Sequence, residues 1–171
     1  MRYTVHGPYE IPREGNLVTR SAAVKREFWK VVEQDEQGLP RACGCYALVI
    51  RNVVRYVGLA ARQGFKAECF APHKIALYDH ALASGRGEPQ LFLVAKRTPG
   101  GRLAKPSPRG HRDIELLETL FVGRALVRNL RLENIRGTKL LREMTVPGFL
   151  NSRRGEARAL AARALKRAIG G

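Results

Sequence analysis

The most informative hydrophobic pattern is a pair of β-rich runs, 44–51 and 54–58, on either side of a short polar break. Such a pattern predicts a β-hairpin. The length of the turn sets its register. With an odd number of turn residues, Tyr46, Leu48 and Tyr56 share one face of the hairpin, whereas an even number places the tyrosines on opposite faces. Glycines at the open ends would allow the backbone to approach a ligand closely.

Other segments predict strands and loops around this hairpin. Residues 90–96 form a continuous apolar run, which is typical of a strand covered on both faces of a sheet. Residues 1–18 show period-two alternation and predict a short strand or an extended arm. Residues 59–70 lack periodicity and predict a loop.

Helical spacing of apolar residues predicts an amphipathic helix over 21–34, with Ser21 as its N-cap and Trp29 in the core. Pro72 is a favourable first residue for a second helix. Asp113 is the predicted cap of a third. The predicted helices after the first are 72–83, 113–129, 139–143 and 154–168.

Length and composition indicate a globular protein. A chain of 171 residues, 44% of them hydrophobic, is long enough to form one domain with a core. No apolar run reaches the ~18 residues that a membrane-spanning helix needs. The N-terminus has no secretory pattern, and three cysteines do not indicate a disulfide framework. We therefore expect a cytoplasmic protein that does not enter a membrane.

Charge points to an anionic partner. The chain has 31 lysines and arginines against 15 aspartates and glutamates, a formal net charge of +16. Nucleic acid is the first candidate, and DNA is expected over RNA. Residues 97–112 hold five basic residues and no carboxylate. This segment is either a mobile surface loop or a loop that embraces DNA and orders on phosphate contact.

Short sequence motifs in the predicted hairpin and in a later helix add to the evidence from charge. The hairpin carries Gly-Cys-Tyr at 44–46 and Tyr-Val-Gly at 56–58. Further on, 118–122 reads Glu-Thr-Leu-Phe-Val, and Asn134 follows. In this order the motifs resemble the GIY-YIG nuclease family, which is named for the two tripeptides and has a single carboxylate on a later helix. The resemblance covers residues 42–136.

The resemblance implies a fold and an activity. The fold would be α/β of the α+β type, with a small three-stranded antiparallel sheet from 44–51, 54–58 and 90–97 flanked by helices. The activity would be metal-dependent endonucleolytic hydrolysis of phosphodiester bonds in DNA, with Mg²⁺ or Mn²⁺ as cofactor. Restriction, repair and mobile-element enzymes share this fold, and the sequence does not choose among them.

The resemblance also assigns roles to side chains. Glu118 would bind the metal, Tyr46 and Tyr56 would position the attacking water, and Asn134 would brace the site through hydrogen bonds. A free tyrosine has a pKa near ~10, so cationic neighbours must lower it before it can act as a base at neutral pH. Glu115 is a rival metal ligand because it lies three residues from Glu118 on the same helix.

The family's phosphate-contacting arginine has no clear counterpart, because the corresponding position is Lys66 in the predicted loop. Arg62 and Lys74 are the other candidates, and we favour Lys74 because it lies on a predicted helix. His80 or His73 could take the place of the family's histidine near the phosphate. The residues expected to contact nucleic acid are Gly58, Arg62, Lys66, His73, Arg102, Lys105 and Arg109.

Other interpretations remain open. A zinc site could use Cys43, Cys45, Cys69 and His73, but structural sites favour two residues between the first pair of ligands. Cysteines on one strand face more often pack as small apolar groups. In function, the alternatives are a catalytically inactive nucleic-acid-binding module and a basic scaffold protein that prefers structured RNA.

The domain organisation follows from these elements. The whole chain, 1–171, is predicted to be a single domain with a nuclease-like core at 42–136. An N-terminal arm and helix, 1–41, and a C-terminal helical extension, 137–171, would pack on that core. The last helix would dock through its alanine and leucine side.

Overall fold

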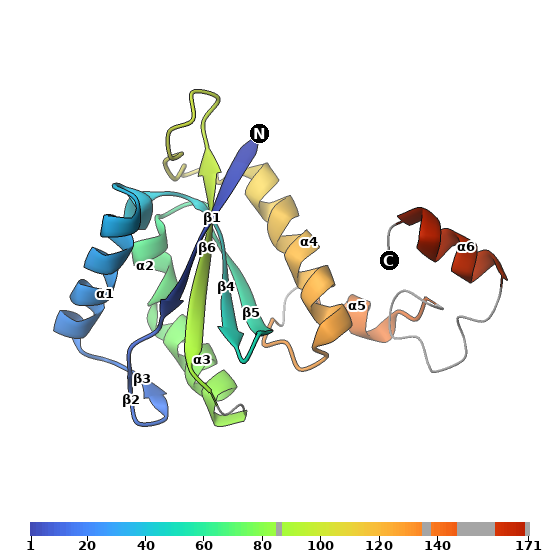
Figure 1. The fold of residues 1–171 in the computed structure, drawn as a ribbon, viewed down its shortest axis with the longest axis horizontal. Coiled ribbons are helices and arrows are strands. Elements are labelled where there is room, and N and C mark those ends of the chain that lie inside the picture. Colours follow the sequence, from blue (N-terminus) through green and yellow to red (C-terminus); the bar gives the residue numbers. More distant parts are fainter. Residues whose placement is uncertain (85–86, 135–137, 147–159, 170–171) are drawn as a thin grey trace.

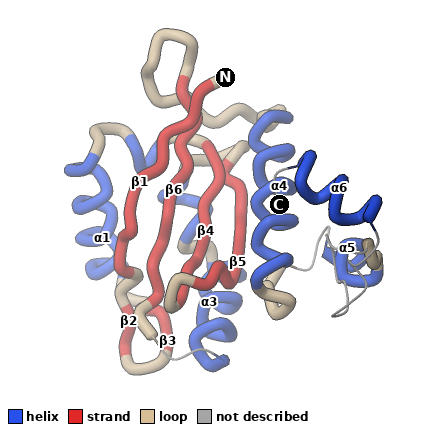
Figure 2. The backbone as a smooth tube through the Cα atoms, turned by 45° about the vertical axis from the view of Figure 1, so that its right-hand side comes forward, coloured by secondary structure: helices blue, strands red, loops and turns tan. Residues whose placement is uncertain are grey.

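The computed structural model describes residues 1–84, 87–134, 138–146 and 160–169. Its centre is a four-stranded antiparallel sheet in the order β1-β6-β4-β5 (Figures 1 and 2). The strands are β1 (Arg2–Glu10), β4 (Gly44–Ile50), β5 (Val53–Ala60) and β6 (Pro89–Arg97). The three predicted strands are therefore present, and the N-terminal arm adds a fourth.

Helices cover both faces of this sheet. The first core cluster joins one face to α1 (Ala22–Asp35), α2 (Phe65–Cys69) and α3 (Pro72–Ser84). The other face packs against α4 (Arg112–Arg128). The sheet is thus covered on both faces, as the apolar run in β6 predicts. The smaller elements are β2 (Arg13–Glu14), β3 (Leu17–Val18), η1 (Leu39–Arg41), α5 (Thr138–Glu143) and α6 (Leu160–Ile169).

The β4–β5 hairpin has an even turn but keeps both tyrosines on one face. Arg51 and Asn52 form the two-residue turn, with φ values of 53° and 60°. Such a turn alone would separate the tyrosines. The pairing shifts after Val49, which opposes Val54, so that Arg55 is an extra residue and Leu48 opposes Tyr56. This β-bulge brings Tyr56 to the same core cluster as Tyr46.

The first helix agrees with its prediction. The Ser21 hydroxyl accepts a hydrogen bond from the Val24 backbone N–H at 3.4 Å, so Ser21 is the N-cap. Trp29 is buried and packs edge-on against Phe28 and Phe70. Trp29 therefore belongs to the core, as its position on an amphipathic helix predicts.

The basic segment after β6 is tied to the sheet without a ligand. The Ala104 N–H donates to the Lys96 carbonyl at 2.9 Å, and the Cys43 N–H donates to the Ala104 carbonyl at 3.1 Å. Closer to α4, the Ser107 N–H donates to the Ala61 carbonyl at 3.0 Å. These bonds tie the backbone of the segment to the sheet along a defined path.

Two sequence predictions were wrong at the level of local structure. Residues 59–70 contain the end of β5 and the short helix α2, so they are not a loop. Asp113 does not cap α4, because His111 occupies the N-cap position. The Asp113 carboxylate instead accepts hydrogen bonds from the Tyr3 hydroxyl at 2.6 Å and the Lys96 ammonium at 2.8 Å.

The C-terminal part agrees only partly with expectation. Residues 154–159 of the predicted last helix lie outside the described residues, and α6 begins at Leu160. Leu160 is 81% exposed and Leu165 is 50% exposed, so its predicted docking side is open to solvent. Among the described residues, no helix is long and apolar enough to cross a membrane.

Candidate active site

A cleft of about 900 Å³ runs along β5, the strand at one edge of the sheet. Helices α2 and α3 form one wall and α4 forms the other, because these helices cover opposite faces of the sheet (Figure 2). The polar residues that line it are Tyr56, Arg62, Gln63, Glu68, Lys74, Glu115, Glu118, Thr119, Glu133 and Asn134. The edge of β5 thus gathers charged groups from four separate elements.

Tyr56 and Lys74 form the centre of the cleft. The Lys74 ammonium donates a hydrogen bond to the Tyr56 hydroxyl at 2.5 Å and lies 4.8 Å from the centroid of its ring. The β-bulge before Tyr56 aims the phenol at α3, where Lys74 lies in the first turn. The ammonium group is thus fixed directly beside the phenol oxygen.

Glu68 holds Lys74 from the other side. The Glu68 carboxylate lies 3.5 Å from the Lys74 ammonium and accepts a hydrogen bond from the Gln63 amide at 2.6 Å. Both carboxylate oxygens therefore have a donor. Sequence reasoning missed Glu68 because it assigned residues 59–70 to a loop. The sequence signal for this helix is the apolar pair Phe65 and Cys69, which are four residues apart and both buried. That spacing would have predicted one turn of helix carrying Glu68.

Glu118 lies on the buried side of α4, between Ile114 and Val122 one turn away in each direction. Burial raises the pKa of its carboxyl group, Lys74 opposes that shift, and the nearby Glu115 and Glu68 reinforce it. Glu118 makes no hydrogen bond or ion pair with any residue that the structure describes. It is therefore a half-buried carboxyl group that faces a polar cleft without a bonded partner.

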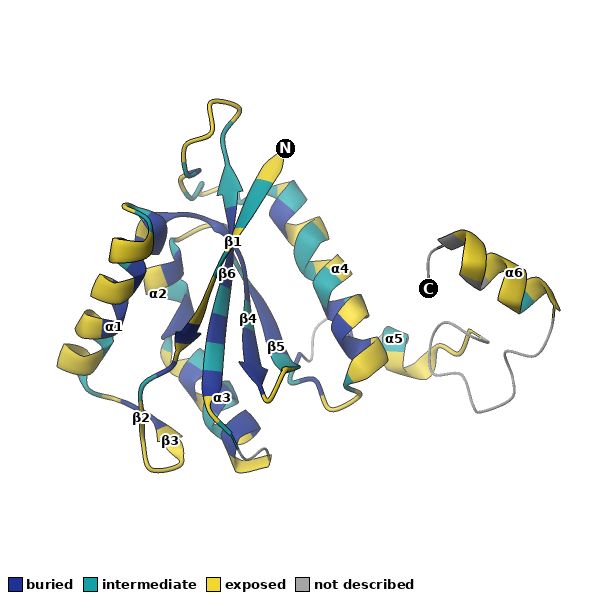
Figure 3. Ribbon diagram, viewed as in Figure 1, coloured by how far each residue is buried: buried dark blue, intermediate teal, exposed yellow. Residues whose placement is uncertain are grey.

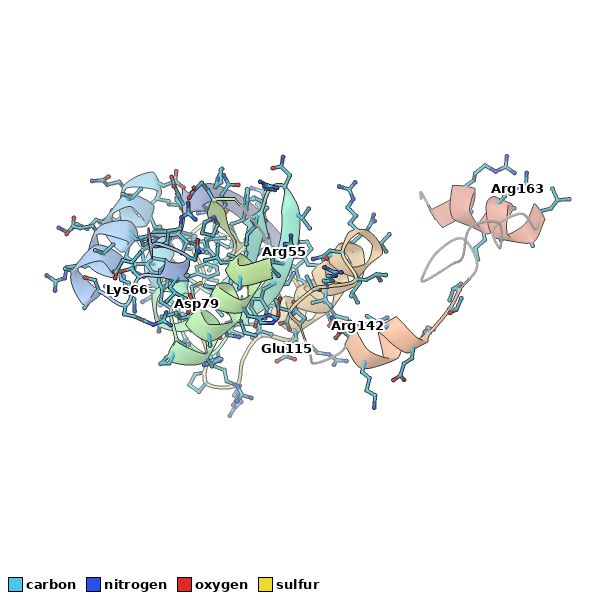
Figure 4. The ribbon with its side chains drawn as sticks, turned by 90° about the horizontal axis from the view of Figure 1, so that it is seen from below. Arg55, Lys66, Asp79, Glu115, Arg142 and Arg163 are labelled. Carbon is cyan, nitrogen blue, oxygen red and sulfur yellow. The ribbon has the colours of Figure 1, made fainter. Side chains whose placement is uncertain are left out.

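Glu115, the rival of Glu118, also lines the cleft but lies nearer its rim. The side chain is exposed and comes close to Gly110 in the basic segment. Arg62 also lies beside Gly110, so both side chains flank this glycine at the rim. Figure 4 shows Glu115 on the same side of the molecule as Arg142 of α5. Both predicted carboxylates thus belong to one site, with Glu118 deeper.

Asn134 braces β5 rather than the metal-ligand helix. Its side-chain oxygen accepts from the Val57 N–H at 2.9 Å, and its amide donates to the Val57 carbonyl at 2.7 Å. The Glu133 N–H donates to the Arg55 carbonyl at 2.8 Å. This segment therefore satisfies the free edge of β5 on either side of Tyr56. Asn134 holds Tyr56 in place through the strand.

The two histidines named from the sequence differ in their positions. His80 forms a hydrogen bond to the Glu133 carboxylate at 2.9 Å, so it reaches the cleft indirectly. His73 is exposed, and no hydrogen bond or ion pair links it to a described residue. His80 is thus at the margin of the site, and His73 is outside it.

Tyr46 does not reach the cleft. Its side chain is fully buried, and its hydroxyl makes no hydrogen bond to a described residue. Burial, with Tyr78 beside it, raises the pKa of Tyr46 well above its ordinary value. Gly58 packs against this phenol, and a Cβ there would come within 2.3 Å of the Tyr46 ring. Gly58 is itself buried and makes room for Tyr46, and its contact with nucleic acid stays a prediction.

The remaining basic candidates fall into separate surfaces. Arg62 lines the cleft. Lys66 lies in a shallow groove with Trp29 on the side of α1, away from Glu115 (Figure 4). Arg102 and Lys105 line another groove beside η1. The further candidate, Arg109, lies in the loop segment before α4, next to Gly110. Of these residues, only Arg62 lines the same cleft as Lys74, whereas Lys66, Arg102 and Lys105 line other grooves.

The cysteines do not assemble a zinc site with His73. Cys43, Cys45 and Cys69 are free and buried, whereas His73 is exposed. The Cys43 thiol donates to the Lys105 carbonyl, and the Cys45 thiol donates to the Ile114 carbonyl. Within the described residues, no group of three or more histidine, cysteine, aspartate or glutamate side chains could hold a metal ion. The thiols therefore pack as core groups.

The carboxylates still suit a hydrated Mg²⁺. This ion commonly binds through one or two carboxylates and keeps several waters. Glu118 has oxygens without bonded donors, and Glu115 lines the same cleft. These two side chains would hold the ion.

Comparison of the chain with models of protein families, with curated proteins and with solved structures returned no match. The contacts of the cleft therefore carry the functional argument.

Proposed function

We propose that this chain is a metal-dependent endonuclease that hydrolyses phosphodiester bonds in DNA, with a GIY-YIG-like arrangement of site residues, and that it acts in the cytoplasm. The observation that carries the proposal is one cleft with Tyr56 from β5, Lys74 from α3 and Glu118 from α4. These residues are far apart in the sequence. A nuclease needs a positioned water, charge neutralisation and a metal ligand, and each has a candidate here.

Tyr56 orients the attacking water, and its phenolate form, left after the phenol proton has passed to solvent, would accept the proton of that water. The Tyr56 oxygen receives a hydrogen bond from the Lys74 ammonium at 2.5 Å. Lys74, which touches this oxygen, would also neutralise charge on a phosphoryl oxygen. A lysine neutralises an oxygen as a point charge and lacks the paired hydrogen bonds of arginine. Tyr46 is not part of this chemistry, because its buried hydroxyl has no access to the cleft.

Glu118 and Glu115 would hold a divalent cation, which would supply Lewis-acid stabilisation of the phosphoryl group and the leaving oxygen. Glu118 must be ionised to bind it. Because burial favours the neutral carboxyl, ion binding and proton release are coupled at this residue. Arg62 at the rim binds the phosphate backbone beside the scissile bond.

A specific observation supports a second candidate, a catalytically inactive nucleic-acid-binding module. Lys74, the only predicted replacement for the family's arginine that touches Tyr56, is already engaged by Glu68. A lysine held in this way could serve packing alone. Such a module would bind DNA or RNA with strong salt dependence and would cut neither.

Plasmid nicking in the presence of Mg²⁺ or Mn²⁺ separates the two candidates. The endonuclease predicts nicking that stops with a chelator and with Glu118→Ala, while binding to the plasmid persists. Glu27→Gln, an exposed carboxylate on α1, is the matched control and should cut normally. Binding with no cutting under either cation would leave only the binding module. Cutting that survives Glu118→Ala would remove Glu118 from the site.

A further inference from the structure

The outer side of α4 carries a row of apolar side chains in solvent. Leu116 is 64% exposed, Leu120 is 55% exposed and Val127 is 64% exposed. Gly123 lies between the last two, and a Cβ built on it would meet no atom within 4 Å. Exposed positions recur along this helix (Figure 3). We call Leu116, Leu120, Gly123 and Val127 the α4 stripe.

The spacing of the α4 stripe is that of a helix–helix seam. Its members are four, three and four residues apart, which is the repeat of the a and d positions of a coiled coil. With 3.6 residues per turn, Leu116, Leu120 and Val127 lie roughly 160–200° around the helix from Glu118. The stripe therefore faces away from the cleft, and a partner bound there leaves the cleft open.

The charges beside the stripe have one sign. Arg112 and Arg124 occupy the flanking g and e positions of this repeat, where charges select the partner helix. Both arginines are exposed, and no hydrogen bond or ion pair connects either to a described residue. The carboxylate of Asp113 at the N-terminal end is already bound to Lys96 and Tyr3. The stripe thus has unsatisfied positive charge on both flanks.

The charge of these arginines indicates which kind of helix binds the α4 stripe. A second copy of this chain would bring the same arginines and a further net charge of +16 to the interface. The α6 helix of the same chain carries Arg163 and Arg167, so its charge also has the wrong sign. We propose that the α4 stripe is the docking site for an amphipathic helix of a partner protein, with apolar residues at a and d and acidic residues at e and g.

Synthetic helical peptides test this proposal on the full chain. One 21-residue peptide carries leucine at a and d and glutamate at e and g, and a second has the same composition in scrambled order. The account expects the chain to bind the ordered peptide at least tenfold more tightly than the scrambled one, as measured by fluorescence anisotropy. Equal binding of the two would show only attraction of a basic protein to acidic peptides and would overturn the proposal.

Two variants locate the binding. Leu116→Gln with Leu120→Gln removes two apolar side chains of the α4 stripe without altering its charge. This double variant should bind the ordered peptide at least tenfold more weakly. Val24→Gln with Val31→Gln, at exposed apolar positions of α1, is the matched control and should bind normally. Arg112→Glu with Arg124→Glu should transfer preference to a peptide with lysine at e and g.

Sedimentation of the free protein gives a further check. The account expects a monomer. A dimer that Leu116→Gln with Leu120→Gln dissociates would make the stripe a self-interface and would overturn the proposal. Because the stripe faces away from Glu118, the seam variant should keep any nicking activity, so failure of the endonuclease proposal and failure of this one remain distinguishable.

Discussion

Two charged networks lie at opposite edges of the sheet, and they differ in how their carboxylates are satisfied. At the β1 edge, the Asp35 carboxylate accepts hydrogen bonds from Tyr9 and from His6, and these bonds hold the pKa of Asp35 below its usual value. Glu36 forms two hydrogen bonds with Arg97, both of 2.5 Å. Each carboxylate in this network has its donors within the protein.

The cleft at the β5 edge has the opposite character. Glu118 has no bonded donor among the described residues, and burial raises the pKa of its carboxyl group. A perturbed carboxyl group in a cleft is more typical of a functional site than of a structural one. The comparison teaches that the β1 network supports the fold, whereas the cleft keeps a carboxyl group available for a ligand.

The largest expected effect concerns the β1 edge. Arg97→Met should lower the free energy of unfolding by about 2–4 kcal/mol, because it leaves the partly buried Glu36 carboxylate without its partner. Denaturant unfolding followed by circular dichroism measures this. The rate of plasmid nicking by the folded fraction should not change. Loss of nicking without loss of stability would place Arg97 in the functional site.

The two tyrosines offer a sharper test. Tyr56→Phe should lower kcat for nicking about 10–100-fold, because it removes the hydroxyl that receives the Lys74 hydrogen bond. Tyr46→Phe should stay within about twofold of the unmodified chain, since its hydroxyl is buried without a bonded partner. Equal losses in the two variants would contradict the separation between Tyr56 and Tyr46.

A smaller effect is expected at Glu68. Glu68→Gln keeps the size of the side chain but removes the charge that holds Lys74. We expect kcat to fall about 3–10-fold with little change in KM, because positioning of Lys74 matters most in the transition state. A single-turnover assay over a pH series measures this. An unchanged rate and pH profile would make Glu68 a bystander.

The smallest effect is on stability at Glu118. The pKa of the Glu118 carboxyl group is raised in the folded state, so ionisation of this group lowers the free energy of unfolding. The protein therefore loses stability as the pH rises through that pKa. Glu118→Gln cannot ionise and should be more stable than the unmodified chain at pH 7. The gain should be less than about 1 kcal/mol, because the side chain is only partly withdrawn from water. Thermal unfolding should show the difference vanish at acidic pH.

Local sequence signals predicted much of the fold. Apolar runs located β4, β5 and β6, and helical spacing located α1, α3 and α4. The pairing of β1 with β6 depends on tertiary contacts between distant segments, so the alternating pattern of residues 1–18 predicted only a strand or an extended arm. The short helix α2 was missed because a single turn has too few residues for a periodic signal.

The candidate site was predictable only in part. The resemblance to a known family pointed to Tyr56 and Glu118, and the predicted helix pointed to Lys74; all three line one cleft. Burial of Tyr46 was not predictable, because it depends on the packing of its phenol over Gly58 in the opposing strand. Glu68 was missed for a similar reason, since its role comes from contact with Lys74 on the next helix.

The most direct measurement compares one glutamate from each network in the same nicking assay with Mg²⁺. Glu118→Gln should reduce the rate by about 10²–10³-fold, and Glu36→Gln should cut at the unmodified rate once corrected for its folded fraction. Equal rates for the two variants, whether both retained or both lost, would contradict the assignment of the β5 cleft as the functional site.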